Sequence, residues 1–229
     1  MATRTGMNLG RDIDLDALPL RERKKIQTGI RIWNTAIALF AERGFDQVSV
    51  AEIAAAAEVS KMTVFNYFPS KEDLVMGPME QHLDEPAEVV RERAPGTSAV
   101  AALREQYLSA LERFDPATGL SDQQAALDVI RLVHHTPALL MRATAGFDHR
   151  AQSLLTAELL AQDPDHDELT ARIAAAQLLA TQLALTGENQ RRMMAGESAA
   201  DALPEALDRA RRAFALVEHG LGDYCARTA

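Results

Sequence analysis

The side chains with the clearest chemical pattern lie between residues 49 and 71. Hydroxyl, ammonium and amide groups follow one another closely there, and such groups donate hydrogen bonds to phosphate oxygens and to base edges. Met62 lies among them and offers an apolar contact for a thymine methyl group. The candidate contact residues are Ser49, Ser60, Lys61, Met62, Thr63, Asn66, Tyr67 and Lys71.

Three short helices are expected to position these side chains. The pairs Ser49/Glu52 and Ser70/Asp73 have the spacing of capping boxes, in which a hydroxyl and an acid satisfy each other's backbone N–H groups. Ser60 offers the start of another helix directly after an alanine-rich one, and two short helices joined by a tight turn form a helix-turn-helix. Their inner faces are Val50, Ile53, Ala54, Ala57, Val64 and Phe68.

A longer helix is predicted in front of this motif, from about Leu20 to Arg43. An apolar residue recurs in it at steps of four and three, which is typical of one buried helix face. Gly44 follows as a C-terminal stop signal. The stripe consists of Ile26, Ile30, Trp33, Ile37 and Phe40, widened by Ile32, Ala36 and Leu39.

A family resemblance rests on these motifs. The runs LFAERGF, SVAEIA and VSKMTVFNYFPSKEDL occur in the order and spacing of TetR-family repressors, so residues 20 to 75 resemble their DNA-binding domain. Lys71 resembles the family lysine that meets the DNA backbone. Glu58 stands where the family usually has Gly; a left-handed conformation there costs about 1 kcal/mol for a non-Gly residue. Phe65 replaces a usual Tyr, which removes one phosphate-contacting hydroxyl and leaves Tyr67 to supply the other.

The expected fold is all-α. Aromatic residues are only 5% of a chain rich in Ala and Leu, which favours helices over sheet. The expected division is a mobile N-terminal arm at 1–19, the helix-turn-helix domain at 20–70, and a larger helical ligand-binding and dimerisation domain at 71–229. A further helix is expected from residue 71, interrupted by Pro78 and Pro86. Others are expected at about 97–114, 121–134, 137–162, 165–187 and 201–226. A capping box at Ser121–Gln124 and Asp165 are the start signals of two of them, and Gly187 is a stop signal.

The last two predicted helices are candidates for a homodimer surface. The first is rich in Ala, and the second carries an apolar stripe through Leu203, Leu207, Ala210, Phe214, Val217, Leu221 and Tyr224. Both stripes could instead be intramolecular core. The resemblance implies a four-helix bundle made by two subunits, and a two-fold dimer reads a pseudo-palindrome in successive major grooves about 34–36 Å apart or a multiple of it.

The resemblance also implies an apolar effector pocket in the larger domain. Each candidate lining residue, taken singly, could instead belong to the core. The candidates are Met76, Met79, Leu108, Leu111, Ile130, His134, Leu140, Met141, Phe147 and Gln182.

Charge and composition narrow the function further. The net charge of −9 is uneven, because residues 1–75 hold 10 basic and 10 acidic residues and the remaining residues hold 14 and 23. Arg21, Lys24, Lys25 and Arg31 therefore form part of a local basic strip, which suits phosphate attraction over a short screening length. A single cysteine, Cys225, and the lack of an apolar membrane span or signal sequence favour the cytoplasm.

The sequence thus predicts a ligand-responsive transcriptional regulator, a repressor released from a double-stranded operator by a small apolar effector. No Cys/His cluster has metal-ligand spacing, and no nucleophile elbow, phosphate-binding loop or dinucleotide fingerprint occurs, so neither a metal site nor a cofactor is expected. A constitutive DNA-binding protein without effector is the first alternative, and a helical enzyme is the second.

Overall fold

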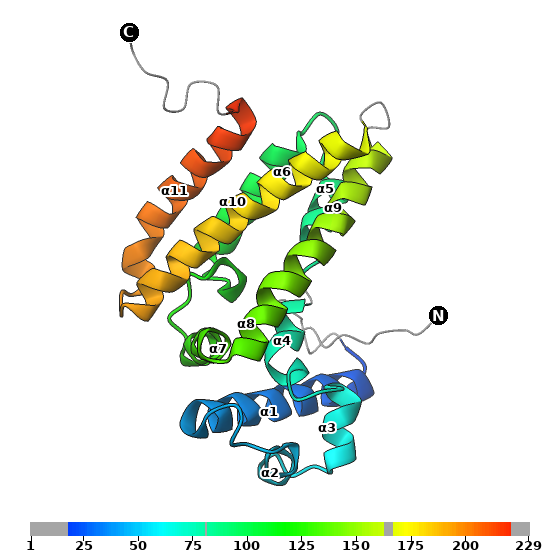
Figure 1. Ribbon diagram of the computed structural model, residues 1–229, viewed down its shortest axis with the longest axis vertical. Helices are drawn as coiled ribbons and strands as arrows, with labels where there is room; N and C mark the ends of the chain where they lie inside the picture. Colours follow the sequence, from blue (N-terminus) through cyan, green and yellow to red (C-terminus); the bar gives the residue numbers. More distant parts are fainter. Residues whose placement is uncertain (1–17, 81, 163–166, 221–229) are drawn as a thin grey trace. The chain divides into compact units, whose positions relative to one another are not determined.

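The computed structural model describes residues 18–80, 82–162 and 167–220, apart from the side chains of residues 145–148. These residues form helices and no strand, so the predicted all-α fold is confirmed for the part described (Figure 1). The chain divides into two compact units. Unit 1 holds the residues up to Leu83 together with Gln123–Phe147, and unit 2 holds Asp84–Asp122 and the residues from Asp148 onward.

Unit 1 contains six α-helices and one π-helical turn within its described residues. The helices are α1 (Leu20–Arg43), α2 (Val50–Ala56), α3 (Lys61–Tyr67), α4 (Asp73–Glu80), α7 (Gln124–His135) and α8 (Pro137–Met141), followed by the π-helical turn η3 (Arg142–Gly146). The sequence-based boundary at residue 70 assigns Gln123–Phe147 to the larger domain, whereas packing groups this segment with α1 to α4.

One hydrophobic core holds unit 1 together. Ile32 and Phe40 of α1, Ile53 of α2 and Val64 of α3 are fully or almost fully buried in it. The same core takes in residues from later helices, namely Leu74, Val75, Met76, Leu132, Val133 and Leu139. Burial of a large apolar side chain contributes about 1.5–3 kcal/mol, so the helix-turn-helix draws much of its stability from residues outside it.

Unit 2 is built from longer helices. They are α5 (Glu85–Glu92), α6 (Ala99–Glu112), the short 3₁₀ helix η2 (Pro116–Thr118), α9 (Phe147–Gln162), α10 (Glu168–Met194) and α11 (Ala199–His219). α11 packs against both α10 and α6 (Figure 1). Its fully buried face is formed by small residues and one aromatic ring, namely Ala199, Ala202, Ala206, Ala210 and Phe214. Leu203, Leu207 and Val217 of the predicted stripe are only half-buried.

A close approach between η2 and α10 depends on glycine. A Cβ atom at Gly119 would lie 2.5 Å from the carbonyl oxygen of Thr186, and the residue has a φ of +74°. Next to it, the buried Asn189 side chain donates to the Thr118 carbonyl at 2.9 Å. The Tyr107 hydroxyl lies in the same cluster, where burial raises the pKa of Tyr107 to about 12. This cluster joins α6, η2 and α10 through buried polar groups that have partners.

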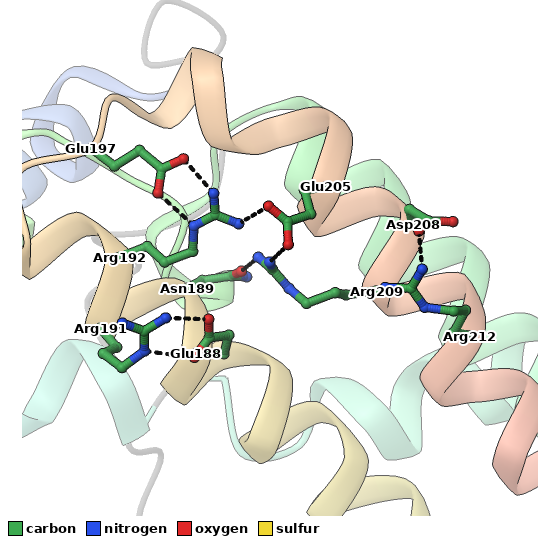
Figure 2. Close-up of polar contacts among 9 residues, drawn as sticks. All are labelled: Glu188, Asn189, Arg191, Arg192, Glu197, Glu205, Asp208, Arg209 and Arg212. Atoms are coloured by element: carbon green, nitrogen blue, oxygen red, sulfur yellow. Dashed lines mark hydrogen bonds and ion pairs between the residues drawn. The ribbon is translucent and has the colours of Figure 1, made fainter.

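Ion pairs extend this cluster to α11 (Figure 2). Arg192 of α10 contacts Glu197 and, at 2.5 Å, Glu205 of α11, and Arg209 reaches Glu205 at 2.9 Å and Asn189 at 3.3 Å. Arg192 and Arg209 are largely covered, so their charges are less screened than those of exposed pairs. The network fixes the relative position of α10 and α11.

Several predicted helix limits need correction. The capping box at Ser121–Gln124 does not form: the Ser121 hydroxyl is buried without a partner, and Gln123 precedes α7 without a side-chain cap. Asp122 instead accepts a hydrogen bond from the backbone N–H of Ala199, at the first turn of α11. The acid next to the serine is therefore used by another helix.

The predicted start and end of the 165–187 helix are also displaced. Asp167 caps α10, whereas Asp165 lies outside the described residues. The helix runs through Gly187 to Met194, because buried residues on both sides, Leu185, Asn189 and Met193, continue its packing face. A glycine inside a helix costs about 1 kcal/mol, which such burial exceeds.

The two prolines of the 71–94 segment behave differently. Pro78 lies inside α4, whereas Pro86 occupies the first turn of α5, where its missing N–H costs nothing. The break between the two helices therefore comes before Pro86. The segment 137–162 is continuously helical as expected, with η3 inserted between α8 and α9. α11 ends at His219, and the arm at 1–17, Leu221, Tyr224 and Cys225 lie outside the described residues.

Candidate nucleic-acid interface

The helix-turn-helix forms as its capping residues predict. The Ser49 hydroxyl accepts from the Glu52 backbone N–H at 3.3 Å, and the Ser49 N–H donates to the Glu52 carboxylate at 2.9 Å. Ser60 accepts from the Thr63 N–H at 3.0 Å and begins α3. Both hydroxyls are thus engaged in helix caps, so their first role is to fix where α2 and α3 begin.

The outer face of α3 is open to solvent. Lys61, Met62, Phe65 and Asn66 are exposed, Met62 to 69% and Phe65 to 37%. Thr63 is half-buried, as is Tyr67, while Val64 faces the core. The Lys61 ammonium lies 5.8 Å from the Phe65 ring, which holds the charge along the outer side of the helix. One short helix therefore presents a cation, an amide, a phenol and apolar groups side by side.

Glu58 adopts the conformation for which its family position usually has Gly. Its φ is +52°, and the turn after α2 has the two hydrogen bonds of a Schellman motif, from Val59 to the Ala54 carbonyl and from Glu58 to the Ala55 carbonyl. The left-handed residue costs about 1 kcal/mol in a non-Gly side chain. The two hydrogen bonds of the turn form in spite of this strain.

Lys71 lies beside two aromatic rings of unit 1. Its ammonium is 4.4 Å from the centre of the Phe45 ring and 5.6 Å from that of Phe40. Lys71 comes between the Ser70 cap and the first residue of α4, Asp73. The cation–π contacts restrict the side chain and place its charge at the start of α4, where the helix dipole is also positive.

An acid in the interface region is neutralised locally. Glu52 accepts hydrogen bonds from the Ser49 backbone, from Arg43 at 2.7 Å and from the Ser49 hydroxyl, and these lower its pKa to about 2. The basic residues of α1 flank the motif in the same unit, with Arg21, Lys24, Lys25 and Arg31 exposed. The exposed surface of α1 to α3 therefore combines a basic strip with a carboxylate that is already paired.

The predicted effector residues are distributed over both units. Met76, Met79, Ile130, His134, Leu140 and Met141 belong to unit 1, and Leu108, Leu111 and Gln182 to unit 2. Met76 and Leu111 are fully buried core residues, whereas His134, Leu140 and Met141 are exposed. The Phe147 side chain lies outside the described residues. An effector site made from this set stays a prediction.

A depression lies in unit 1, at the end of α1 and beside α7. It has a volume of about 500 Å³ and is lined in part by Phe45, Asp128, Arg131 and His135. None of the ten predicted effector residues lines it. Among the described residues, no group of three or more His, Cys, Asp or Glu side chains could hold a metal ion, and no helix has the length and apolarity to cross a membrane.

Arg142 of this region was not singled out by the sequence analysis. Arg142 forms ion pairs with Asp73 and Glu80 of α4, although it lies 62 and more residues away in the chain. A capping box can be recognised in the sequence because its two residues are three positions apart. An ion pair between residues more than 60 positions apart has no such pattern in the sequence.

Comparison with known proteins agrees with the geometry. Residues 32–76 match the family described as bacterial regulatory proteins, tetR family. The regulator TcmR of Streptomyces glaucescens is 30% identical over 122 residues, which are 53% of this chain and 54% of TcmR. LuxR of Vibrio harveyi is 41% identical over 64 residues, 27% of this chain and 31% of LuxR. The chain thus matches about half or less of the length of these relatives.

Solved structures share the fold over a greater length. NalD, the secondary repressor of the MexAB-OprM multidrug efflux pump in Pseudomonas aeruginosa, aligns with a TM-score of 0.54 and 19% identity over 82% of this chain and 97% of NalD. GusR of Salmonella enterica aligns with a TM-score of 0.53 and 23% identity over 84% and 96%. Residues 32–76 of this chain thus match the DNA-binding segment of the tetR family of bacterial regulatory proteins, and the described residues share the all-helical fold of NalD and GusR.

Proposed function

We propose that this protein is a ligand-responsive transcriptional repressor that binds a pseudo-palindromic operator as a homodimer and leaves it when a small apolar effector binds. The observation that carries the proposal is the outer face of α3, where Lys61, Asn66 and Tyr67 stand on a helix whose start is fixed by the Ser60 cap. In a major groove, Lys61 and Tyr67 would meet phosphates while Asn66 would reach a base edge.

The dimer proposal is supported by an exposed apolar stripe on α10. Leu169, Ile173 and Leu183 are 55%, 49% and 59% exposed, although each is a large aliphatic side chain. Together with the small residues Ala180 and Gly187 they recur at steps of three, four or their sum, which is the spacing of one helix face. Leu216 of α11 adds a further exposed aliphatic group. A second copy of the chain would cover these residues.

An apolar effector is supported by what one structural relative binds. FadR of Bacillus subtilis, which aligns with a TM-score of 0.51 and 19% identity over 82% of this chain and 96% of FadR, was solved in complex with stearoyl-CoA. For our chain, an effector that weakens operator affinity 100-fold must favour the non-binding conformation by about 2.7 kcal/mol.

The test is selection of bound sequences from a random duplex pool with the purified protein. We expect enrichment of an inverted repeat, and its loss in Lys61→Ala and Tyr67→Ala, since each of these removes a group from the outer face of α3. Arg131→Ala is the matched control, because it removes a charge of the same unit that pairs within α7. Failure of the folded protein to enrich any repeat would refute the proposal.

The effector is then sought with the selected duplex. Fluorescence anisotropy would be measured with long-chain acyl-CoA thioesters, free fatty acids and a panel of lipophilic drugs. Release of the duplex by one class identifies the effector. If repression in cells persists and no compound releases the duplex, the protein is a constitutive regulator.

A further inference from the structure

Arg142 connects the two ends of α4. Its Nη2 atom lies 2.5 Å from a carboxylate oxygen of Asp73, the first residue of α4, and 2.5 Å from one of Glu80, its last residue. Its Nε atom donates to the same Glu80 oxygen at 2.9 Å. The three side chains are half-buried, so the charges are partly shielded from solvent. A planar guanidinium with several donors can serve both carboxylates at once, which an ammonium cannot do in the same way.

The Asp73 end of this contact belongs to the cap at the start of α4, which follows α3 closely in the chain. The Ser70 N–H donates to the Asp73 carboxylate at 2.8 Å, and the Asp73 N–H donates to the Ser70 hydroxyl at 3.1 Å, which forms the second capping box. Ser70 follows the last residue of α3, Tyr67, by only three positions. Burial raises the pKa of Asp73, but hydrogen bonds from Arg142 and Ser70 lower it by more, so the carboxylate is ionised at neutral pH.

Both segments that Arg142 joins lead along the chain from unit 1 into unit 2. The chain leaves unit 1 after Leu83, three residues beyond Glu80, and again after Phe147, five residues beyond Arg142. Arg142 itself begins the π-helical turn η3, a local departure from regular α-helix that is often found at functional positions. Arg142 thus joins two segments, each of which continues directly into unit 2.

We propose that Arg142 is a positioning residue for operator reading: it locks α4 and its cap to η3 and so sets the orientation in which α3 is held. Because both locked segments lead into unit 2, this contact also fixes how far apart the two α3 helices of a dimer are held. The inference rests on the proposed function. Arg142 would set which distance between the two halves of the operator the dimer prefers, without contacting DNA itself.

The experiment compares wild type, Arg142→Gln and Arg131→Gln on the selected inverted repeat and on a series of duplexes with one or two base pairs added or removed at its centre. Arg131→Gln is the matched control, since it also removes one positive charge from unit 1, but its partner Asp128 lies on the same helix. For Arg142→Gln we expect operator affinity to fall about tenfold, within the usual range of coupling between sites. We also expect its preference for one spacing to flatten, because the α3 helices are held less tightly.

Two further variants separate positioning from folding. Arg142→Lys keeps the charge but cannot serve both carboxylates equally, so it should restore part of the affinity and part of the spacing preference. Glu80→Gln in the Arg142→Gln background should add little, since the contact is already broken. Hydrogen exchange of the free protein should be faster at α4 and its cap in Arg142→Gln, and unchanged in α6 and α11 of unit 2.

The outcomes are distinct. An Arg142→Gln protein with wild-type spacing preference overturns the inference, as does one that loses affinity equally for every duplex, including one of unrelated sequence. If the wild type itself selects no inverted repeat, the proposed function fails. The same spacing response in Arg131→Gln would also overturn the inference, because loss of charge alone would then explain it.

Discussion

α3 and α10 both leave one face uncovered in this chain, but the two faces differ in chemistry. The outer face of α3 is short and mixed, with Lys61, Asn66 and Tyr67 among apolar groups. The outer face of α10 is long and carries the exposed aliphatic side chains of Leu169, Ile173 and Leu183. A polar face retains its hydration until it meets a polyanion, whereas exposed aliphatic groups gain free energy when a similar surface covers them. Exposure alone therefore does not identify the partner of a helix.

The largest effect is expected from a change to the face of α10. The double variant Ile173→Asp/Leu183→Asp should weaken self-association by more than about 100-fold, since burial of each aliphatic side chain is worth about 1.5–3 kcal/mol and a buried unpaired charge costs more. Analytical ultracentrifugation measures this. Leu154→Asp, on the partly exposed face of α9, is the control and should leave self-association unchanged. A double variant that still associates would show that α10 faces something else.

A smaller effect is expected from the face of α3. Lys61→Ala should weaken operator binding by about 1–3 kcal/mol and reduce the slope of the logarithm of affinity against the logarithm of salt concentration by about one. Titrations at several salt concentrations give both values. Ile173→Asp/Leu183→Asp should lower affinity by loss of the dimer, with little change in the contacts of each half-site. An unchanged salt slope in Lys61→Ala would exclude a phosphate contact at this residue.

The caps give a sharper contrast, because one predicted box forms and another does not. Ser70→Ala should lower the free energy of unfolding by about 1 kcal/mol, since the Asp73 N–H loses its acceptor. Ser121→Ala should be neutral or slightly stabilising, since the buried Ser121 hydroxyl has no partner to lose. Urea unfolding of both variants measures the difference. Equal losses would mean that the Ser121 hydroxyl is bonded after all.

The smallest effect concerns the turn between α2 and α3. Glu58→Gly should raise the free energy of unfolding by roughly 0.5–1 kcal/mol, because glycine adopts the positive φ without strain but loses more chain entropy on folding. Glu58→Ala keeps a Cβ atom and should gain nothing from relief of strain. Thermal unfolding of the two variants measures both changes in stability. If Glu58→Ala were stabilised as much as Glu58→Gly, relief of strain at the positive φ would not be the cause.

The sequence alone determined the elements whose signals are local. The caps at Ser49 and Ser60 act over three residues, so their spacing predicts where α2 and α3 start. The capping box at Ser70 also forms, but α4 begins at Asp73, two residues after the predicted start at Lys71. The apolar periodicity of α1 predicts its length for a similar reason, since neighbouring turns of one helix share one environment. The outward residues of α3 followed from the same periodicity, and so did much of the candidate interface.

Tertiary structure decided the features that depend on distant partners. Asp122 accepts a hydrogen bond from the Ala199 N–H in the first turn of α11, although the sequence pattern assigns it to the start of α7. α10 passes through Gly187 because its packing face continues beyond that residue. Gln123–Phe147 packs with the helix-turn-helix although it lies far along the chain. The Arg142 contact joins residues more than 60 positions apart. Such pairings depend on which surfaces compete for burial once the helices have formed, and the spacing of residues within a segment does not encode that competition.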